Sequence, residues 1–322
     1  MSPSRSNDVG GSSGTGREKR GGWLIGLLVV ALVAGGLVGL GIYLLHRLGS
    51  LPLFHVSQCT AADGGTSFTY QLEQMQNAST IAAVGVKLGV PTFGIEIAEA
   101  TALQESKLYN INGGDRDSLG LFQQRPSMGW GSADQIMDTT YASTAFYQAL
   151  EKVKNWQKLD LTVAAQDVQH SGYPTAYANH EQEALVLSKI FTGTVGGALT
   201  CTLDNPTFAA QPANGKGLTA QGEAVVADAQ KQWGSVSVEG VSAAKRSFAL
   251  ALPGGRSATA ETQRGWAYAN WAVSKAEALG ITSVGFDGKT WSSTNSPGSW
   301  QTTNEAAAAP HDRVVLTMTS GS

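Results

Sequence analysis

Charged side chains are scarce in this sequence. They make up 15% of the 322 residues, and the formal net charge is −3. A basic face of the kind that binds nucleic acid is therefore not indicated, and we expect no nucleic-acid partner. The sequence also lacks a Gly-Lys phosphate-binding motif, a recognisable Ser/His/Asp set and a suitably placed cysteine nucleophile. These absences count against several other enzyme classes.

One long segment contains no charge at all. Residues 23–45 are apolar or glycine-rich, and their length suits a helix across a bilayer core of about 30 Å. No Ala-x-Ala cleavage site follows, so we expect an uncleaved transmembrane anchor. Basic residues precede the segment at Arg5, Arg17, Lys19 and Arg20, whereas Arg47 alone closely follows it. This asymmetry predicts a single-pass cell-membrane protein with a cytoplasmic N-terminus. A buried core helix is the alternative.

There are two cysteines, Cys59 and Cys201. Outside the cytoplasm such a pair tends to be oxidised, and we favour a disulfide over two unpaired buried thiols. The bridge would clamp both ends of one domain and stabilise it by several kcal/mol, as an order of magnitude.

Composition divides the chain into five parts. We expect a disordered cytoplasmic tail at 1–20, the anchor at 21–47, a mostly helical domain at 60–202, a linker at 203–218 and an α+β domain at 219–322. Residues 48–70 read as a connector. The predicted fold class is therefore a mainly α domain plus a small α+β C-terminal domain, after an N-terminal transmembrane helix.

Apolar spacing predicts individual elements. Helices are expected from Asn77 to Leu88, from Pro91 to about Glu105, and over 140–155, 160–170, 178–192, 219–233 and 260–279. Strands are expected at 281–286 and 313–318.

Glu105 is the principal candidate for chemistry. Ile95, Ala98, Ala102 and Glu105 recur at three- and four-residue spacing and so share one helix face. A carboxyl on this apolar stripe is expected at the edge of the interior, where its charged form is disfavoured. Cleavage of a glycosidic bond requires a carboxylic acid that stays protonated near neutral pH.

Three short motifs surround this candidate. They are Glu105-Ser106, then Ser118 followed by Gly120-Leu121-Phe122-Gln123, and the weaker segment 168–172, Val-Gln-His-Ser-Gly. Together they resemble the lysozyme-like superfamily of soluble lytic transglycosylases and goose-type lysozymes. Phe122 stands where that family usually has Met, Gln169 where it has Tyr, and His170 where it has Asn.

The resemblance implies a lysozyme-like fold and an activity on peptidoglycan glycan strands. The expected function is a membrane-anchored peptidoglycan lytic transglycosylase. Glu105 would act as acid and base at the β-1,4 bond between N-acetylmuramic acid and N-acetylglucosamine, without a cofactor, and the sugar's own 6-hydroxyl would give a 1,6-anhydro product. The substrate-binding residues implied or considered with it are Ser118, Gln123, Gln169, His170, Tyr173 and Tyr177, the two tyrosines as possible substitutes for the family's Tyr. Trp130 is a further aromatic that could stack on sugar.

Two other functions remain open. Asp115 or Asp117 could act as a second carboxylate, which would make the protein an inverting lysozyme. Arg125 is expected to brace one of these two aspartates. Alternatively, the lysozyme-like domain could be a non-catalytic peptidoglycan-binding scaffold.

The C-terminal part has its own resemblance. Residues 264–273, 285–291 and 311–316 resemble an actinobacterial cell-wall-associated domain that is distantly similar to zinc D-Ala-D-Ala carboxypeptidases. Zinc catalysis needs about three protein ligands, and His311 is the last of five histidines and the sole one in this part. We therefore expect no metal, and a domain that binds or positions wall polymer. The anchor also suggests, as a further partner, a secretion or conjugation apparatus that spans the wall.

Overall fold

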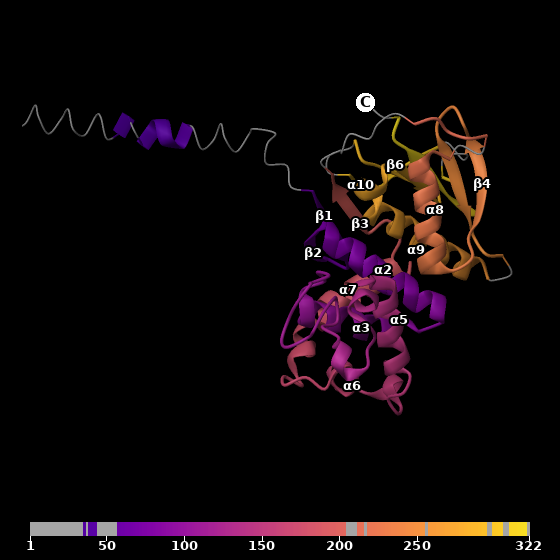
Figure 1. Cartoon of the computed structure of the whole chain (residues 1–322). Coiled ribbons are helices and arrows are strands. Elements are labelled where there is room, and N and C mark those ends of the chain that lie inside the picture. The colour runs from indigo at the N-terminus through magenta and orange to yellow at the C-terminus, as the bar shows by residue number, and fades with distance from the viewer. Residues whose placement is uncertain are drawn as a thin grey trace, which may run out of the picture. The chain divides into compact units, whose positions relative to one another are not determined.

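The structure is a computed structural model that describes residues 35–36, 38–43, 57–203, 211–215, 218–254, 257–294, 298–304 and 309–320 (Figure 1). The chain divides into two compact units, Met1–His55 and Val56–Ser322. The second unit contains all the elements that follow.

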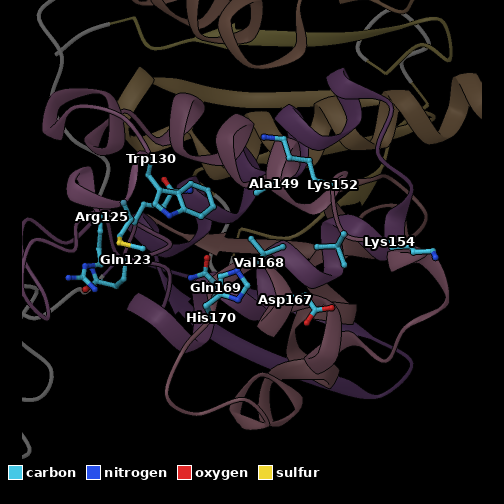
Figure 2. Close-up of a pocket in the computed structure, with 13 residues that line it drawn as sticks. Gln123, Arg125, Trp130, Ala149, Lys152, Lys154, Asp167, Val168, Gln169 and His170 are labelled. Atoms are coloured by element: carbon cyan, nitrogen blue, oxygen red, sulfur yellow. The ribbon is translucent and has the colours of Figure 1, made fainter.

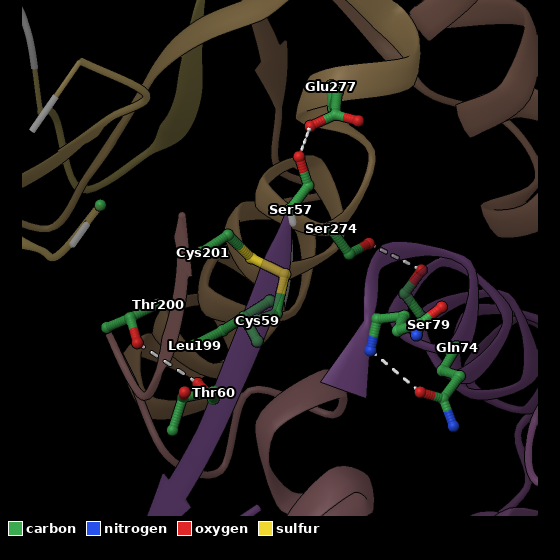
Figure 3. The surroundings of a disulfide bond; sticks show 12 residues. Ser57, Cys59, Thr60, Gln74, Ser79, Leu199, Thr200, Cys201, Ser274 and Glu277 are labelled. Carbon is green, nitrogen blue, oxygen red and sulfur yellow. Dashed lines mark hydrogen bonds between the residues drawn. A yellow bond between two sulfur atoms is a disulfide. The ribbon is translucent and has the colours of Figure 1, made fainter. Parts of the chain in front are cut away.

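Two strands before the first helical segment and one strand after it form a three-stranded antiparallel sheet. Its strands are β1 (Gln58–Asp63), β2 (Thr66–Gln71) and β3 (Leu199–Thr202), in the order β2-β1-β3. Gly64 and Gly65, both with positive φ, form the tight turn between β1 and β2. Cys59 faces Cys201 across the β1–β3 pair, and the two form a buried disulfide (Figure 3). The predicted bridge is therefore confirmed.

Between β2 and β3 the described chain is helical. The helices are α2 (Leu72–Leu88), α3 (Thr92–Ser106), α4 (Ala133–Met137), α5 (Thr139–Leu150), α6 (Leu161–Gln169) and α7 (Glu181–Phe191). Short 3₁₀ turns lie at η2 (Pro126–Met128), η3 (Trp156–Lys158) and η4 (Ala176–His180). Helix α3 is buried on every side from Gly94 to Leu103 and packs against α2, α5, α6 and α7.

A six-stranded antiparallel sheet forms the C-terminal part. Its order is β4 (Ser237–Ser242), β5 (Ser247–Ala251), β9 (Arg313–Met318), β6 (Ile281–Phe286), β7 (Lys289–Ser292) and β8 (Gln301–Thr302). Helices α8 (Ala220–Trp233), α9 (Ala258–Ser274) and α10 (Ala276–Leu279) accompany it. Gly265 lets α9 approach the sheet, because a Cβ there would lie 2.0 Å from the Phe286 ring.

The helical and C-terminal parts share one interior. Ser274 donates to Ser79 across 2.8 Å, and the Lys275 ammonium reaches the Thr80 hydroxyl at 2.9 Å. Asn270 donates to the carbonyl of Ile190. These buried contacts hold α2 and α7 against α9, so the residues expected to form two domains lie in a single compact unit.

The expected fold class is wrong. The segment expected to be mainly α has a three-stranded sheet at its two ends, and the C-terminal sheet has four strands beyond the two expected. Strands β1 and β2 were missed because Thr, Ser and Ala interrupt their apolar alternation, although Gly64-Gly65 is a hairpin signal.

The described residues include no helix able to cross a membrane. Most of the expected span, 23–45, lies outside them, as do the tail 1–20 and much of the linker 203–218.

Two acidic side chains are buried in α3. Glu99 is fully buried, neither of its carboxyl oxygens has a hydrogen-bond partner in the part of the chain that the structure describes, and burial raises its pKa well above the usual range. Burial, and secondly the charge of Glu181, raise the pKa of Glu96 to about 7 against the opposing effect of Lys189. Both carboxyls are therefore stable inside the fold in their neutral form.

This burial predicts that the free energy of unfolding falls as the pH rises above about 4.5. A carboxyl with a raised folded pKa binds its proton more tightly in the folded chain, so stability is full below the unfolded pKa and falls as pH rises. Above about pH 4.5, each group costs up to about 1.4 kcal/mol per pH unit until its folded pKa is passed. We expect Glu99→Gln to reduce the loss of unfolding free energy between about pH 5 and pH 8, as measured by urea denaturation. Exposed Glu151→Gln is the control, and an equal pH dependence in the Glu99→Gln and unmodified proteins would contradict the prediction.

Candidate functional site

Glu105 lies in the last turn of α3, where the helix leaves the core. The helix ends because Lys107 and Leu108 take left-handed conformations, with φ of 54° and 63°. Glu105 is half-buried, and its Oε1 accepts a hydrogen bond of 2.8 Å from the Tyr177 hydroxyl. Tyr177 is fully buried in η4, and burial raises its pKa. It therefore stays protonated and holds one carboxyl oxygen of Glu105 in a fixed direction.

Ser106 attaches the next motif to the end of α3. Its hydroxyl donates to the carbonyl of Leu121 at 2.8 Å and also lies 3.0 Å from the carbonyl of Ala102. A short bridge between Leu119 and Gln124 closes the loop that Leu121 occupies. The Glu-Ser and Gly-Leu-Phe-Gln motifs, separated in sequence, are therefore joined by a buried hydrogen bond.

The Gln123 side chain is turned into its own loop. Its amide donates to the carbonyls of Gly113 and Gly120 at 3.3 and 3.2 Å. A Cβ at position 114 would lie 1.8 Å from Gln123 Oε1, so a larger residue there would displace the Gln123 amide. Gln123 thus supports the loop in this structure. Its side chain is only partly buried.

The two candidate second carboxylates have different surroundings. Asp117 accepts from the backbone and hydroxyl of Ser127 at 2.8 and 3.0 Å and from Arg125 Nε at 3.0 Å. The Ser127 backbone bond, its hydroxyl bond and Arg125, in that order, lower the Asp117 pKa to about 2. The predicted brace by Arg125 is confirmed. Asp115 is exposed, and its carboxylate lies 4.0 Å from Arg116.

The end of α6 lies against the same loop. Gln169 donates to the carbonyl of Phe122 at 2.8 Å, and His170 ends the helix in a left-handed conformation with its side chain exposed. Tyr173 is 77% exposed on the following loop, whereas Ser118 is buried. Gln169 thus holds the loop, while Tyr177 supplies the phenol beside Glu105.

A pocket of about 580 Å³ opens beside this loop (Figure 2). Its lining includes the predicted residues Gln123, Gln169 and His170 together with Trp130. It also includes Lys152, Lys154 and Asp167, which the sequence did not single out. They follow α5 or lie within α6, and no motif spacing connects them to Gln123, so their common location depends on the fold.

The described residues hold no group of three or more His, Cys, Asp or Glu side chains placed to bind a metal ion. In the C-terminal part, His311 Nδ1 lies 2.5 Å from Asp287 Oδ1, and Asp287 also accepts from Trp266.

No known family model matches the sequence, and no curated protein is significantly similar to it.

The Ser106 contact predicts a specific weakness. Replacement by Ala leaves the buried carbonyl of Leu121 without this donor, which costs about 1–3 kcal/mol. We expect Ser106→Ala to lower the unfolding free energy by that amount and to speed amide exchange across the 119–124 loop. Ser237→Ala, at an exposed position of β4, is the control. Unchanged exchange in the 119–124 loop of Ser106→Ala would contradict the role of this hydrogen bond.

Proposed function

We propose that this protein is a peptidoglycan lytic transglycosylase, with Glu105 as its single acid and base. The observation that carries the proposal is the Tyr177–Glu105 hydrogen bond at the end of a buried helix, beside a loop attached through Ser106. The three motifs that carry the resemblance are thereby brought to one place. A carboxyl group held in a fixed direction at the surface suits proton transfer to a bound polymer.

The proposed reaction uses one carboxyl group twice, first as an acid and then as a base. Protonated Glu105 donates to the oxygen between N-acetylmuramic acid and N-acetylglucosamine as the bond from that oxygen to C1 breaks. The resulting carboxylate then removes the proton of the muramic 6-hydroxyl, whose oxygen bonds to C1. The products are a 1,6-anhydro end and a free 4-hydroxyl, and Glu105 is protonated again. Tyr177 keeps the carboxyl oriented through both transfers.

The environment of the two aspartates favours this route over an inverting lysozyme. An inverting enzyme needs a second carboxylate that activates water across the cleft. Asp117 instead accepts three hydrogen bonds within its own loop, and Asp115 projects from an exposed turn beside Arg116. Neither arrangement favours a general base opposite Glu105.

Other parts of the account stay predictions of the sequence. These are the location at a cell membrane with the N-terminus inside, the association with a wall-spanning secretion or conjugation apparatus, and the wall-polymer role of the C-terminal part. The non-catalytic scaffold is the competing function, and the following experiment separates it from the enzyme.

Zymography with murein in the gel tests Glu105 directly. We expect clearing by the unmodified protein and at least about a thousandfold less by Glu105→Gln, because the amide cannot supply the proton. Glu151→Gln, at an exposed position, should clear normally. Equal clearing by both Glu105 forms would remove this residue from the mechanism, and no clearing by the unmodified protein would favour the scaffold.

Tyr177→Phe tests the positioning of the carboxyl. Losing this hydrogen bond costs about 1–3 kcal/mol, so we expect kcat to fall by roughly 5- to 100-fold while KM changes little. Tyr147→Phe is the matched control, because that tyrosine is also buried and its hydroxyl donates to the carbonyl of Ile81 and not to Glu105. A Tyr177→Phe protein that folds normally and keeps its kcat would show that the contact is not used in catalysis.

A further inference from the structure

Two residues connect the pocket beside the Gln123 loop to the candidate site. Gln123 belongs to the loop that Ser106 attaches to the end of α3, and Gln169 bonds the carbonyl of Phe122 in that loop. Both residues also line the pocket (Figure 2). The pocket and the end of α3 that carries Glu105 are therefore attached to the same loop.

The lining carries more positive than negative charge. Arg125, Lys152 and Lys154 are its cations, and Asp167 is the one acid among the described lining residues. Asp117 already neutralises Arg125. Lys152 and Lys154 are exposed, and neither is in an ion pair with any residue that the structure describes. Two unpaired cations in a concave surface attract an anionic group.

The pocket also has an apolar side. Trp130 is half-buried, Met128 is 68% exposed, and Val153 lies between the two lysines in sequence. An exposed methionine and an indole beside cations suit a ligand that combines aliphatic groups with carboxylates. A volume of about 580 Å³ is large enough for a short peptide.

We propose that this pocket binds an acidic peptide stem of the glycan, with its carboxylates beside Lys152 and Lys154. The proposal rests on the proposed function, because that function places a glycan strand at Glu105. An uncharged sugar ring would make no use of the two lysines, whereas a short peptide with free carboxylates uses both the charge and the apolar wall. Asp167, in the same lining, disfavours a carboxylate beside it.

Binding of two matched fragments tests the proposal. One is a soluble glycan fragment whose peptide stems carry free carboxylates, and the other is the same fragment with those carboxylates amidated. Binding of each fragment is measured by calorimetry with the full chain carrying Glu105→Gln, because this substitution prevents turnover. We expect amidation to weaken binding by about fivefold or more, since each exposed ion pair contributes modestly.

Substitution of the lysines should reproduce this loss. In the same background, Lys152→Gln with Lys154→Gln is expected to weaken binding of the free-carboxylate fragment by about fivefold and to leave the amidated fragment unchanged. Lys158→Gln, another exposed lysine outside the pocket, should change neither. Equal binding of the two fragments, equal losses for both in the double variant, or no binding of either would overturn the proposal.

Cleavage assays distinguish a failed pocket from a failed enzyme. Carboxylate-dependent binding without cleavage by the protein that retains Glu105 would support the pocket and reject the proposed function. Cleavage of both fragments at equal kcat/KM, with equal binding, would reject the pocket and leave the proposed function intact.

Discussion

Helix α3 is enclosed by other elements along most of its length, and this burial determines where Glu105 emerges. A helix packed on every side has little freedom to shift, because interiors are filled to the density of organic crystals. Its last turn therefore presents Glu105 at one place. The buried hydroxyl of Ser106 attaches the neighbouring loop to this turn, and the buried hydroxyl of Tyr177 holds the Glu105 carboxyl. The candidate site is thus built on the core and not on a free loop, which is the arrangement that precise positioning requires.

The rest of the unit supports that core from two sides. The Cys59–Cys201 bridge joins β1 to β3 and so closes the chain around all the helices from α2 to α7. On the other side, Ser274 and Lys275 of the C-terminal part contact α2, and Trp300 donates to the carbonyl of Leu199 in β3. The C-terminal part therefore contributes to the stability of the helical part.

Local patterns in the sequence were sufficient for part of this architecture. The helices around Glu105, the Cys59–Cys201 bridge and the Arg125–Asp117 brace follow from apolar spacing, from cysteine count and from charges close in sequence. The three-stranded sheet was not predicted, because β1 pairs with β3 across most of the helical segment and its side chains alternate weakly. Of the six strands in the C-terminal sheet, two were predicted. Lys152 and Lys154 were missed for a related reason. Exposed lysines carry no signal of their own, and the fold alone brings them near Gln169.

The chemistry of the proposal depends on a single carboxyl group, since Asp117 is held by its own loop and Asp115 projects from an exposed turn. A single acid and base leaves the muramic 6-hydroxyl, and not water, as the nucleophile. The mass of the fragments released from purified murein tests this claim most directly. The account predicts fragments ending in 1,6-anhydro-N-acetylmuramic acid, with the mass of one water less than the hydrolysed form. Fragments that all carry reducing ends would contradict it.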